Sequence, residues 1–116
     1  SSGGVVPKGN PDHIRVSSAD SFGAYDITGI DDLTPENYES IHGGYDRAMA
    51  NIDPDCIVPV DELRKLEKEG VFKKLHHFFY TTTGTGTSVN NAEKFGQEIG
   101  EILRKAEVDA AILTAT

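Results

Sequence analysis

The most constraining feature of the sequence is a strand–turn–helix–strand pattern that runs from residue 76 to residue 114. Residues 76–82 are aromatic or β-branched, which predicts a strand, and they lead into the glycine turn 84–88. Apolar residues then recur at helical spacing up to about Ala106, and 108–114 is apolar without alternation, as in buried parallel strands. Such a βαβ unit has a right-handed crossover. The sequence therefore predicts a three-layer, Rossmann-like α/β fold with a mainly parallel sheet.

Two further helices are predicted ahead of this unit. Thr34 is a good N-cap and is followed by proline and an acidic residue, which predicts a short helix over 35–41. Apolar residues at helical spacing predict a second helix over 61–69, capped by Asp61 and ended by Gly70. The charged residues of this second helix are expected to face water.

The remainder of residues 1–56 is broken by glycine and proline and is predicted to form loops, with one short strand at 14–16. So long an irregular stretch is unusual inside a compact domain. We expect a system of active-site or interface loops here, within a single domain that spans residues 1–116 and is incomplete at both ends.

Composition excludes several classes of function. Nineteen acidic residues against eleven basic ones give a net charge of −8, which argues against a nucleic-acid groove or an anionic membrane as the main partner. The sequence contains neither a signal-peptide pattern nor an apolar run of the roughly 20 residues that a membrane span needs. The single cysteine, Cys56, favours a reducing, cytoplasmic setting, and we expect it to be a buried, inert thiol.

The glycine turn is the first candidate for chemistry. It precedes a helix N-terminus, where free backbone N–H groups favour anions. Its spacing is neither that of a phosphate-binding loop nor that of a dinucleotide fingerprint. Two interpretations remain equally open: a tight turn whose hydroxyls cap the helix, or a site for a carboxylate or phosphate formed by Thr85, Gly86, Thr87 and Ser88.

Histidines supply the second set of candidates. The run His42-Gly43-Gly44-Tyr45-Asp46 could do acid–base work if it folds over a site, although spacing alone favours the polar rim of a turn. His76 and His77 are neighbours on a predicted strand, so they point to opposite faces and cannot bind one metal ion together. No other spacing resembles a metal site.

Several stretches, taken in order, resemble the selenoprotein subunit of component B of glycine/sarcosine/betaine reductase. The resemblance covers essentially the whole chain without large gaps. It is carried by residues 1–12, 42–46, 53–55, 58–63, 67–70, 74–76, 79–82, 84–88 and 108–114.

This resemblance implies an oxidoreductase subunit that takes part in reductive cleavage of the C–N bond of a small amine: glycine, sarcosine or betaine. It implies a selenocysteine nucleophile directly after Thr116, a pyruvoyl group on a companion subunit, and a second selenoprotein that accepts the product. The chain itself is expected to hold no catalytic residue, cofactor or metal, and to be inactive alone.

The resemblance also directs the choice of substrate-binding residues, because ligands of parallel α/β sheets bind beyond the carboxyl ends of the strands. We expect the substrate carboxylate at the glycine turn and at the end of 108–114, with two rim residues nearby. The candidates are Thr85, Gly86, Thr87, Ser88, Thr114, Thr116, His42 and Asp46. The alternative is a stand-alone module that binds a small anion or carboxylate at the turn 84–88.

Overall fold

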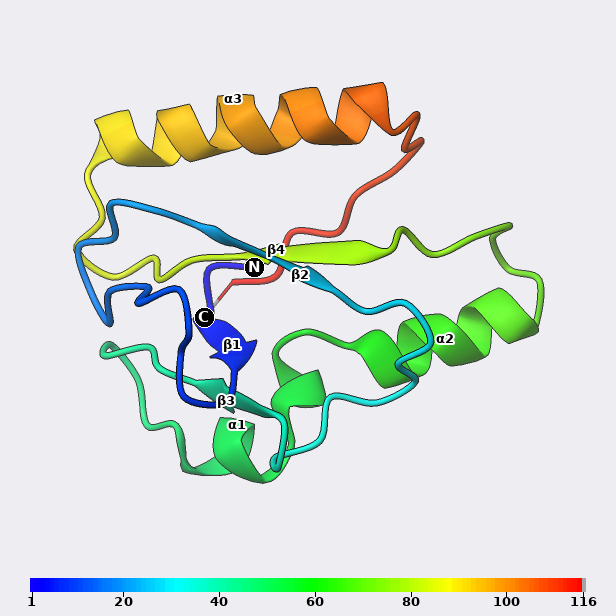
Figure 1. The fold of residues 1–116 in the computed structure, drawn as a ribbon, viewed down its shortest axis with the longest axis horizontal. Coiled ribbons are helices and arrows are strands. Elements are labelled where there is room, and N and C mark those ends of the chain that lie inside the picture. The colour runs from blue at the N-terminus through cyan, green and yellow to red at the C-terminus, as the bar shows by residue number, and fades with distance from the viewer. Residues whose placement is uncertain (116) are drawn as a thin grey trace.

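Two small antiparallel sheets organise the chain (Figure 1). The computed structural model describes residues 1–115. Strand β1 (Val5–Pro7) pairs with β3 (Tyr38–Ser40), and β2 (Gly23–Asp26) pairs with β4 (Phe78–Thr81). The fold is therefore mixed α/β, as predicted, but the pairing is antiparallel.

Helices cover the β2–β4 sheet on both sides (Figure 1). The long helix α3 (Val89–Lys105) lies on one side and α2 (Val60–Lys68) on the other. The short helix α1 (Ala48–Ile52) and a 3₁₀ turn, η1 (Pro54–Cys56), follow β3. No helix among residues 1–115 has the length and apolar character to cross a membrane.

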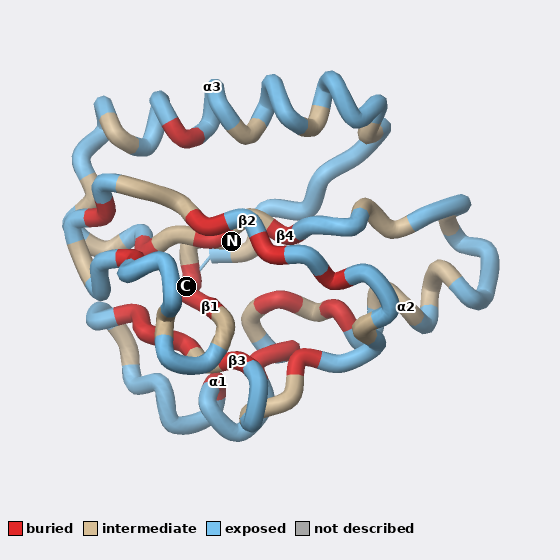
Figure 2. Tube along the Cα trace, viewed as in Figure 1, coloured by how far each residue is buried: buried red, intermediate tan, exposed pale blue. Residues whose placement is uncertain are grey.

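The core is concentrated around the strands and the turn before α2 (Figure 2). Helix α3, by contrast, buries only Phe95, whose ring meets that of Phe22 edge-on at 5.9 Å. The buried apolar cluster consists of Val5, Val6, Ile14, Tyr25, Ile27, Leu33, Tyr38, Ile41, Val58, Val60 and Phe79.

Helix α2 confirms the helix predicted over 61–69, shifted by one residue, but the cap predicted at Asp61 is wrong, because the N-cap is Pro59 and no side chain caps the helix. Gly70 ends it with φ +76°, a conformation that glycine adopts without strain. The Gly70 N–H donates to Glu67 O at 3.1 Å, and the Val71 N–H donates to Leu66 O at 3.0 Å. This pair of bonds is a Schellman motif, which satisfies the last carbonyls of the helix.

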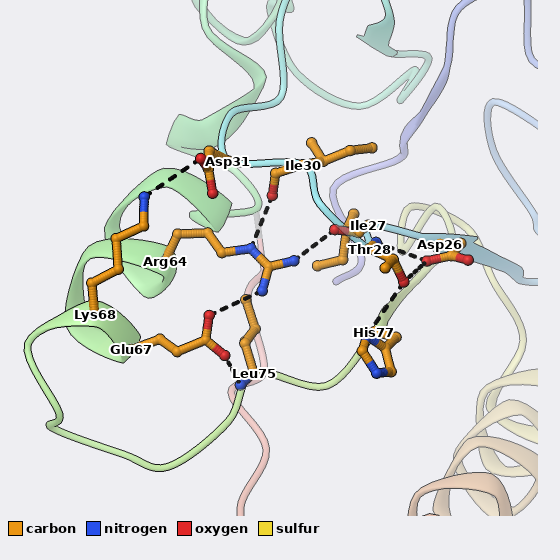
Figure 3. Close-up of polar contacts among 10 residues, drawn as sticks. All are labelled: Asp26, Ile27, Thr28, Ile30, Asp31, Arg64, Glu67, Lys68, Leu75 and His77. Carbon is orange, nitrogen blue, oxygen red and sulfur yellow. Dashed lines mark hydrogen bonds and ion pairs between the residues drawn. The ribbon is translucent and has the colours of Figure 1, made fainter.

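Arg64 fastens α2 to the loop after β2 (Figure 3). Its Nε donates to Ile30 O at 2.9 Å and its Nη2 to Ile27 O at 2.6 Å. Its Nη1 lies 3.1 Å from Glu67 Oε1, and Glu67 Oε2 accepts the Leu75 N–H at 2.6 Å. One guanidinium therefore joins the loop after β2, helix α2 and the segment before β4. The prediction that the charged residues of this helix face water is wrong for Arg64, whose side chain is only 11% exposed.

The prediction of strand, turn and helix over residues 76–106 is also confirmed, with β4 shorter than predicted. Ser88 is the N-cap of α3: its Oγ accepts the Asn91 N–H at 3.2 Å. A capping serine of this kind is typically worth about 1 kcal/mol of helix stability.

The helix predicted over 35–41 is wrong. The N–H groups of Asn37 and Tyr38 both donate to Thr34 O, at 3.1 and 2.9 Å, so the chain makes one turn and no more. It then extends into β3, where Tyr38 and Ser40 are buried at alternate positions. Pairing with β1 overrides the local helix signal, because the strand gains a hydrogen-bonded neighbour and buries Tyr38 and Ser40.

The loop prediction for residues 1–56 is wrong for β1, β2 and β3, and the strand predicted at 14–16 does not form. Ile14 is buried, but its backbone pairs with a side chain instead of a strand. Asn10 Oδ1 accepts the Ile14 N–H at 3.0 Å, and Asn10 Nδ2 donates to Ile14 O at 2.9 Å.

The strand predicted over 108–114 is not formed either, so the predicted parallel sheet is not seen. One long-range backbone bond reaches the segment, from the Ser2 N–H to Thr114 O at 3.0 Å. Ile112 is 66% exposed and Leu113 is 91% exposed. A central parallel strand needs a neighbour on its edges, and only Ser2 reaches this one within the described residues.

Candidate functional site

His42 is the most buried of the predicted site residues whose side chain can act as an acid or base. It is 3% exposed and follows β3 directly. Its Nδ1 accepts the Gly44 N–H at 3.0 Å, whereas its Nε2 is buried with no hydrogen-bond partner among the described residues. Desolvation, and secondarily the charge of Arg47, lowers the pKa of His42 and favours a neutral ring. Since Nδ1 accepts, we infer that Nε2 carries the proton and is a donor without an acceptor.

Two backbone bonds fix His42 in this place. The Ile41 N–H donates to Gly4 O at 2.9 Å, and the Gly43 N–H donates to Val16 O at 2.7 Å. Gly4 has φ +68°, and a Cβ on it would lie 3.0 Å from His42 Cβ. Only glycine fits at this position, because any side chain would combine backbone strain with a clash.

Gly44 brings His42 next to the glycine turn. A Cβ built on Gly44 would lie 2.8 Å from His42 Cε1 and 2.9 Å from Thr85 Cβ. The imidazole also packs against Tyr45, with ring centroids 4.8 Å apart. His42 and Thr85, predicted from separate motifs, therefore share one contact region.

A polar triangle beneath Tyr45 was not foreseen from the sequence. Ser40 Oγ and Tyr45 Oη each donate to Gly3 O at 3.0 Å, and the two hydroxyl oxygens lie 2.7 Å apart. No local signal identifies Ser40 or Gly3, because β1–β3 pairing brings them together across 37 positions of the sequence.

The hydroxyls of the glycine turn hold structural hydrogen bonds. Thr87 Oγ1 donates to Thr83 O at 2.7 Å and accepts the Ala19 N–H at 2.9 Å. Ser88 Oγ caps α3, as described above. Ser88 thus caps the helix, whereas Thr87 Oγ1 joins the turn to the loop before β2.

The backbone of the turn is tied to the loop before β2. The Ser18 N–H donates to Thr85 O at 2.8 Å. Gly86 has φ +67°, and a Cβ on it would lie 2.9 Å from Ser18 Oγ. The turn therefore has a fixed shape, set by contacts with residues almost 70 positions earlier.

Thr87 and Thr114 line one small groove, about 330 Å³ in volume, beneath the N-terminal half of α3. Two backbone bonds connect its walls: the Ser2 N–H donates to Thr114 O, and the Gly84 N–H donates to Ser2 O, both at 3.0 Å. The end of the segment 108–114 therefore lies beside the glycine turn, as predicted.

The other predicted site residues lie elsewhere. Asp46 is exposed, and its carboxylate accepts the Ala48 N–H at 3.0 Å at the start of α1. Thr116 lies outside the described residues. The structure thus brings together His42 with Thr85, and Thr87 with Thr114, but not all the candidates around one cavity.

The surroundings of Cys56 do not favour reactivity. Cys56 is exposed, so its predicted burial is wrong. Partial desolvation and two neighbouring carboxylates, Asp53 and Asp55, raise the pKa of its thiol, which makes it a weak nucleophile.

His76 Nε2 lies 3.1 Å from Tyr80 Oη, and His77 Nδ1 lies 3.3 Å from Thr28 Oγ1. These adjacent histidines therefore meet different partners. Within residues 1–115, no three His, Cys, Asp or Glu side chains lie close enough together to hold a metal ion.

Comparison with known proteins connects this geometry to a family. The family described as glycine/sarcosine/betaine reductase selenoprotein B matches residues 1–116. No solved structure matches the chain.

Three relatives illustrate the range of similarity. The glycine reductase complex component B subunit gamma of Symbiobacterium thermophilum is 56% identical over 99% of this chain and 27% of its own length. From Peptoclostridium acidaminophilum, the sarcosine reductase complex component B subunit beta is 52% identical over 99% of this chain, and the betaine reductase complex component B subunit beta is 46% identical over 98%. Each of these two matches covers 26% of the relative.

The chain thus spans about a quarter of the length of the curated relatives it matches. The match nevertheless includes every motif that carried the resemblance, and it confirms that resemblance. The chain belongs to the glycine/sarcosine/betaine reductase selenoprotein B family.

Proposed function

We propose that this chain is part of the substrate-binding subunit of a glycine/sarcosine/betaine reductase, in which the C–N bond of a small amine is cleaved reductively. Its support is the family match along all 116 residues, together with relatives named as component B subunits of glycine, sarcosine and betaine reductase complexes. We expect companion subunits in the same complex and a cytoplasmic location.

His42 is the residue of this chain that we propose to hold the substrate carboxylate, a group that all three candidate amines share. The structural observation that carries this assignment is the buried Nε2, which has no hydrogen-bond partner within residues 1–115. A donor in this state gains a full hydrogen bond from an incoming oxygen, because no existing bond has to be broken. Thr85 lies across Gly44 from the ring and would take part in the same contact.

Access to Nε2 requires displacement of the segment that covers it. Gly43 and Gly44 are exposed, and beside them the Tyr45 ring packs against the imidazole at a tilt of 40°. Glycines lower the cost of such a movement, because their backbone adopts many conformations. The backbone N–H groups at the start of α3 would add a favourable field for an anion.

The nucleophile and the activating group belong to parts of the complex outside the described residues. A selenocysteine after Thr116 would supply a selenolate nucleophile, and a pyruvoyl group on a companion subunit would make the amine a better leaving group. In support, Thr114 is joined through Ser2 to Gly84, so the end of the segment 108–114 lies beside the glycine turn. A second selenoprotein is the expected acceptor of the product.

The test is calorimetric titration of the complete reductase complex with glycine, sarcosine, betaine and phosphate. We compare the natural protein with His42→Leu, which removes the Nε2 donor, and with His42→Gln, which keeps an amide donor at a similar position. One hydrogen bond to a charged group is worth about 1.5–3 kcal/mol, so His42→Leu should weaken amine binding roughly 10- to 100-fold. The glutamine variant should recover part of this loss.

His76→Leu is the matched control, because His76 is half-buried and its Nε2 lies 3.1 Å from Tyr80 Oη, and neither residue belongs to the contact region of His42 and Thr85. It should leave amine binding within twofold of the natural protein. Equal binding by the natural protein and His42→Leu would contradict the assignment of His42. Tight phosphate binding by the isolated chain, with no amine binding by the complex, would favour the stand-alone anion-binding module instead.

A further inference from the structure

A large apolar groove runs between β4 and the segment 108–114. Its volume is about 720 Å³. Helix α2 and the loop after it form one wall, and α3 forms the other (Figure 1). Apolar side chains project into it from both helices and from the strand-like segments between them: Leu63, Phe79, Ile99, Leu103 and Ile112.

The edge of β4 that faces this groove is open. The Ile27 N–H donates to His77 O at 2.7 Å, which sets the alternation of hydrogen bonds along the antiparallel β2–β4 pair. With this alternation, Phe79 bonds to β2, whereas the peptide groups of Phe78 and Tyr80 point away from β2 and towards the groove. Among residues 1–115, neither of their N–H groups has a hydrogen-bond partner on that side.

Ser1 already forms one rung of a ladder on this edge. Its nitrogen donates to Tyr80 O at 2.7 Å, and its carbonyl oxygen accepts the Thr82 N–H at 3.0 Å. In parallel strands, a residue bonds to the two residues that flank its partner on the neighbouring strand, and Ser1 does the same with Tyr80 and Thr82. Ser1 is thus in parallel register with Thr81.

The next residue bonds in the opposite direction. The Ser2 N–H donates to Thr114 O at 3.0 Å, as expected for a strand that lies between two neighbours. Gly3 then forms an antiparallel bridge with Thr83, and Gly4, with φ +68°, turns the chain away into β1. Ser1 and Ser2 therefore occupy the last two positions of a path that lies between β4 and 108–114.

We propose that the groove is the slot of one further β-strand. This strand leads into Ser1 from its N-terminal side, runs parallel to β4, and is apolar on both faces. Continuing the register predicts its hydrogen bonds. On one flank it would accept from the Tyr80 N–H and donate to Phe78 O. On the other flank it would accept from the Thr114 N–H and donate to Ile112 O.

This occupant accounts for three observations at once. The groove is apolar on both helical sides, as the surroundings of a central parallel strand are. Ile112 and Leu113 are exposed because the segment that carries them lacks its neighbour. The relatives are about four times as long as this chain, so proteins of this family contain polypeptide beyond the region that matches it. With the slot filled, 108–114 would become a third parallel strand.

The test adds the hexapeptide Lys-Val-Ile-Val-Val-Val directly ahead of Ser1 in the otherwise unchanged chain. The control extension carries proline at the last two positions before Ser1, which removes the two N–H donors that the slot would use. Amide hydrogen exchange is followed by NMR in both proteins and in the unextended chain. The Tyr80 and Thr114 amides should exchange at least tenfold more slowly with the hexapeptide than with the proline control.

Ile112→Asp supplies a second variant, because Ile112 is 66% exposed in the unextended chain and its replacement should leave that chain folded. In the extended chain it should abolish the slow exchange of Thr114. The Val6 amide, in the distant β1, reports in every variant that the core is intact. Equal exchange of Tyr80 and Thr114 with and without the hexapeptide overturns the proposal. Slow exchange of the Tyr80 and Thr114 amides with the free hexapeptide, but not with the fused one, also overturns the proposal, because it would indicate a strand from a separate partner.

Discussion

Arg64 Nη1 lies 3.1 Å from Glu67 Oε1, and the same guanidinium donates to two carbonyl oxygens of the loop after β2 (Figure 3). The Arg64 side chain is only 11% exposed. Replacing it with lysine keeps the charge but loses the planar fork that reaches three acceptors. We expect Arg64→Lys to lower the free energy of unfolding by about 2–3 kcal/mol, measured by urea denaturation followed by circular dichroism.

Arg104→Lys is the matched control. Arg104 pairs with Glu101 on α3 at 2.7 Å, but its side chain is 75% exposed. Exposed pairs of this type are worth about 0.5 kcal/mol or less. Equal losses of stability in the two variants would mean that Arg64 does not join the three segments in solution.

Asp55 is expected to make the stability of the protein depend on pH. Its two carboxylate oxygens accept the Leu33 N–H at 2.8 Å and the Asp61 N–H at 3.0 Å. Burial, and secondarily a hydrogen bond with Asp32, raises the pKa of Asp55 from 3.8 to about 6. Because the folded state holds this proton more tightly than the unfolded state, the contribution of Asp55 to stability is complete below about pH 4. It is lost as the pH rises through 6.

The measurement compares the free energy of unfolding of the natural protein and Asp55→Asn between pH 4 and pH 7. A shift of about two pKa units corresponds to about 3 kcal/mol, so the natural protein should lose up to that amount relative to the variant. A difference that stays constant with pH, or that changes in favour of the natural protein, would show that Asp55 is ionised throughout.

Local signals in the sequence predicted the elements that local contacts determine. The cap at Ser88 acts on an N–H three residues away, and Gly70 acts on carbonyls within one helical turn. The pairing of β2 with β4 joins residues more than 50 positions apart, and β2 is too short to have its own periodic signal. The strand predicted over 108–114 is absent because its formation depends on a neighbour that the described residues do not supply.

The candidate site, too, was predictable only where local sequence determines it. His42 was chosen because an imidazole next to two glycines is chemically useful, and its burial could not be seen in that motif. Gly4, near the start of the chain, lies against it: a Cβ on Gly4 would be 3.0 Å from His42 Cβ and 3.1 Å from Thr83 Cγ2. Such a contact between three distant segments has no signature in a single sequence.

Phe95 is expected to hold α3 on the sheet. It is the buried residue of this helix, and its ring meets Phe22 edge-on. Phe95→Ala should lower the free energy of unfolding by about 3–5 kcal/mol, because it removes a large buried ring. Ile102→Ala, at a 40% exposed position of the same helix, should cost about 1 kcal/mol or less. Similar costs in urea denaturation would mean that α3 is held along its whole length.

Gly44→Ala tests the contact between His42 and the glycine turn. The added Cβ would lie 2.8 Å from His42 Cε1 and 2.9 Å from Thr85 Cβ, so one of these groups has to move. Because cores resist such insertions, we expect a loss of about 1–3 kcal/mol in the free energy of unfolding. In the complete complex we also expect weaker binding of the amine substrate.

Gly100→Ala, in α3 with open space around its Cβ, should instead stabilise the chain by about 0.5–1 kcal/mol. If Gly44→Ala is as stable as Gly100→Ala and binds the amine normally, His42 and Thr85 do not form one site.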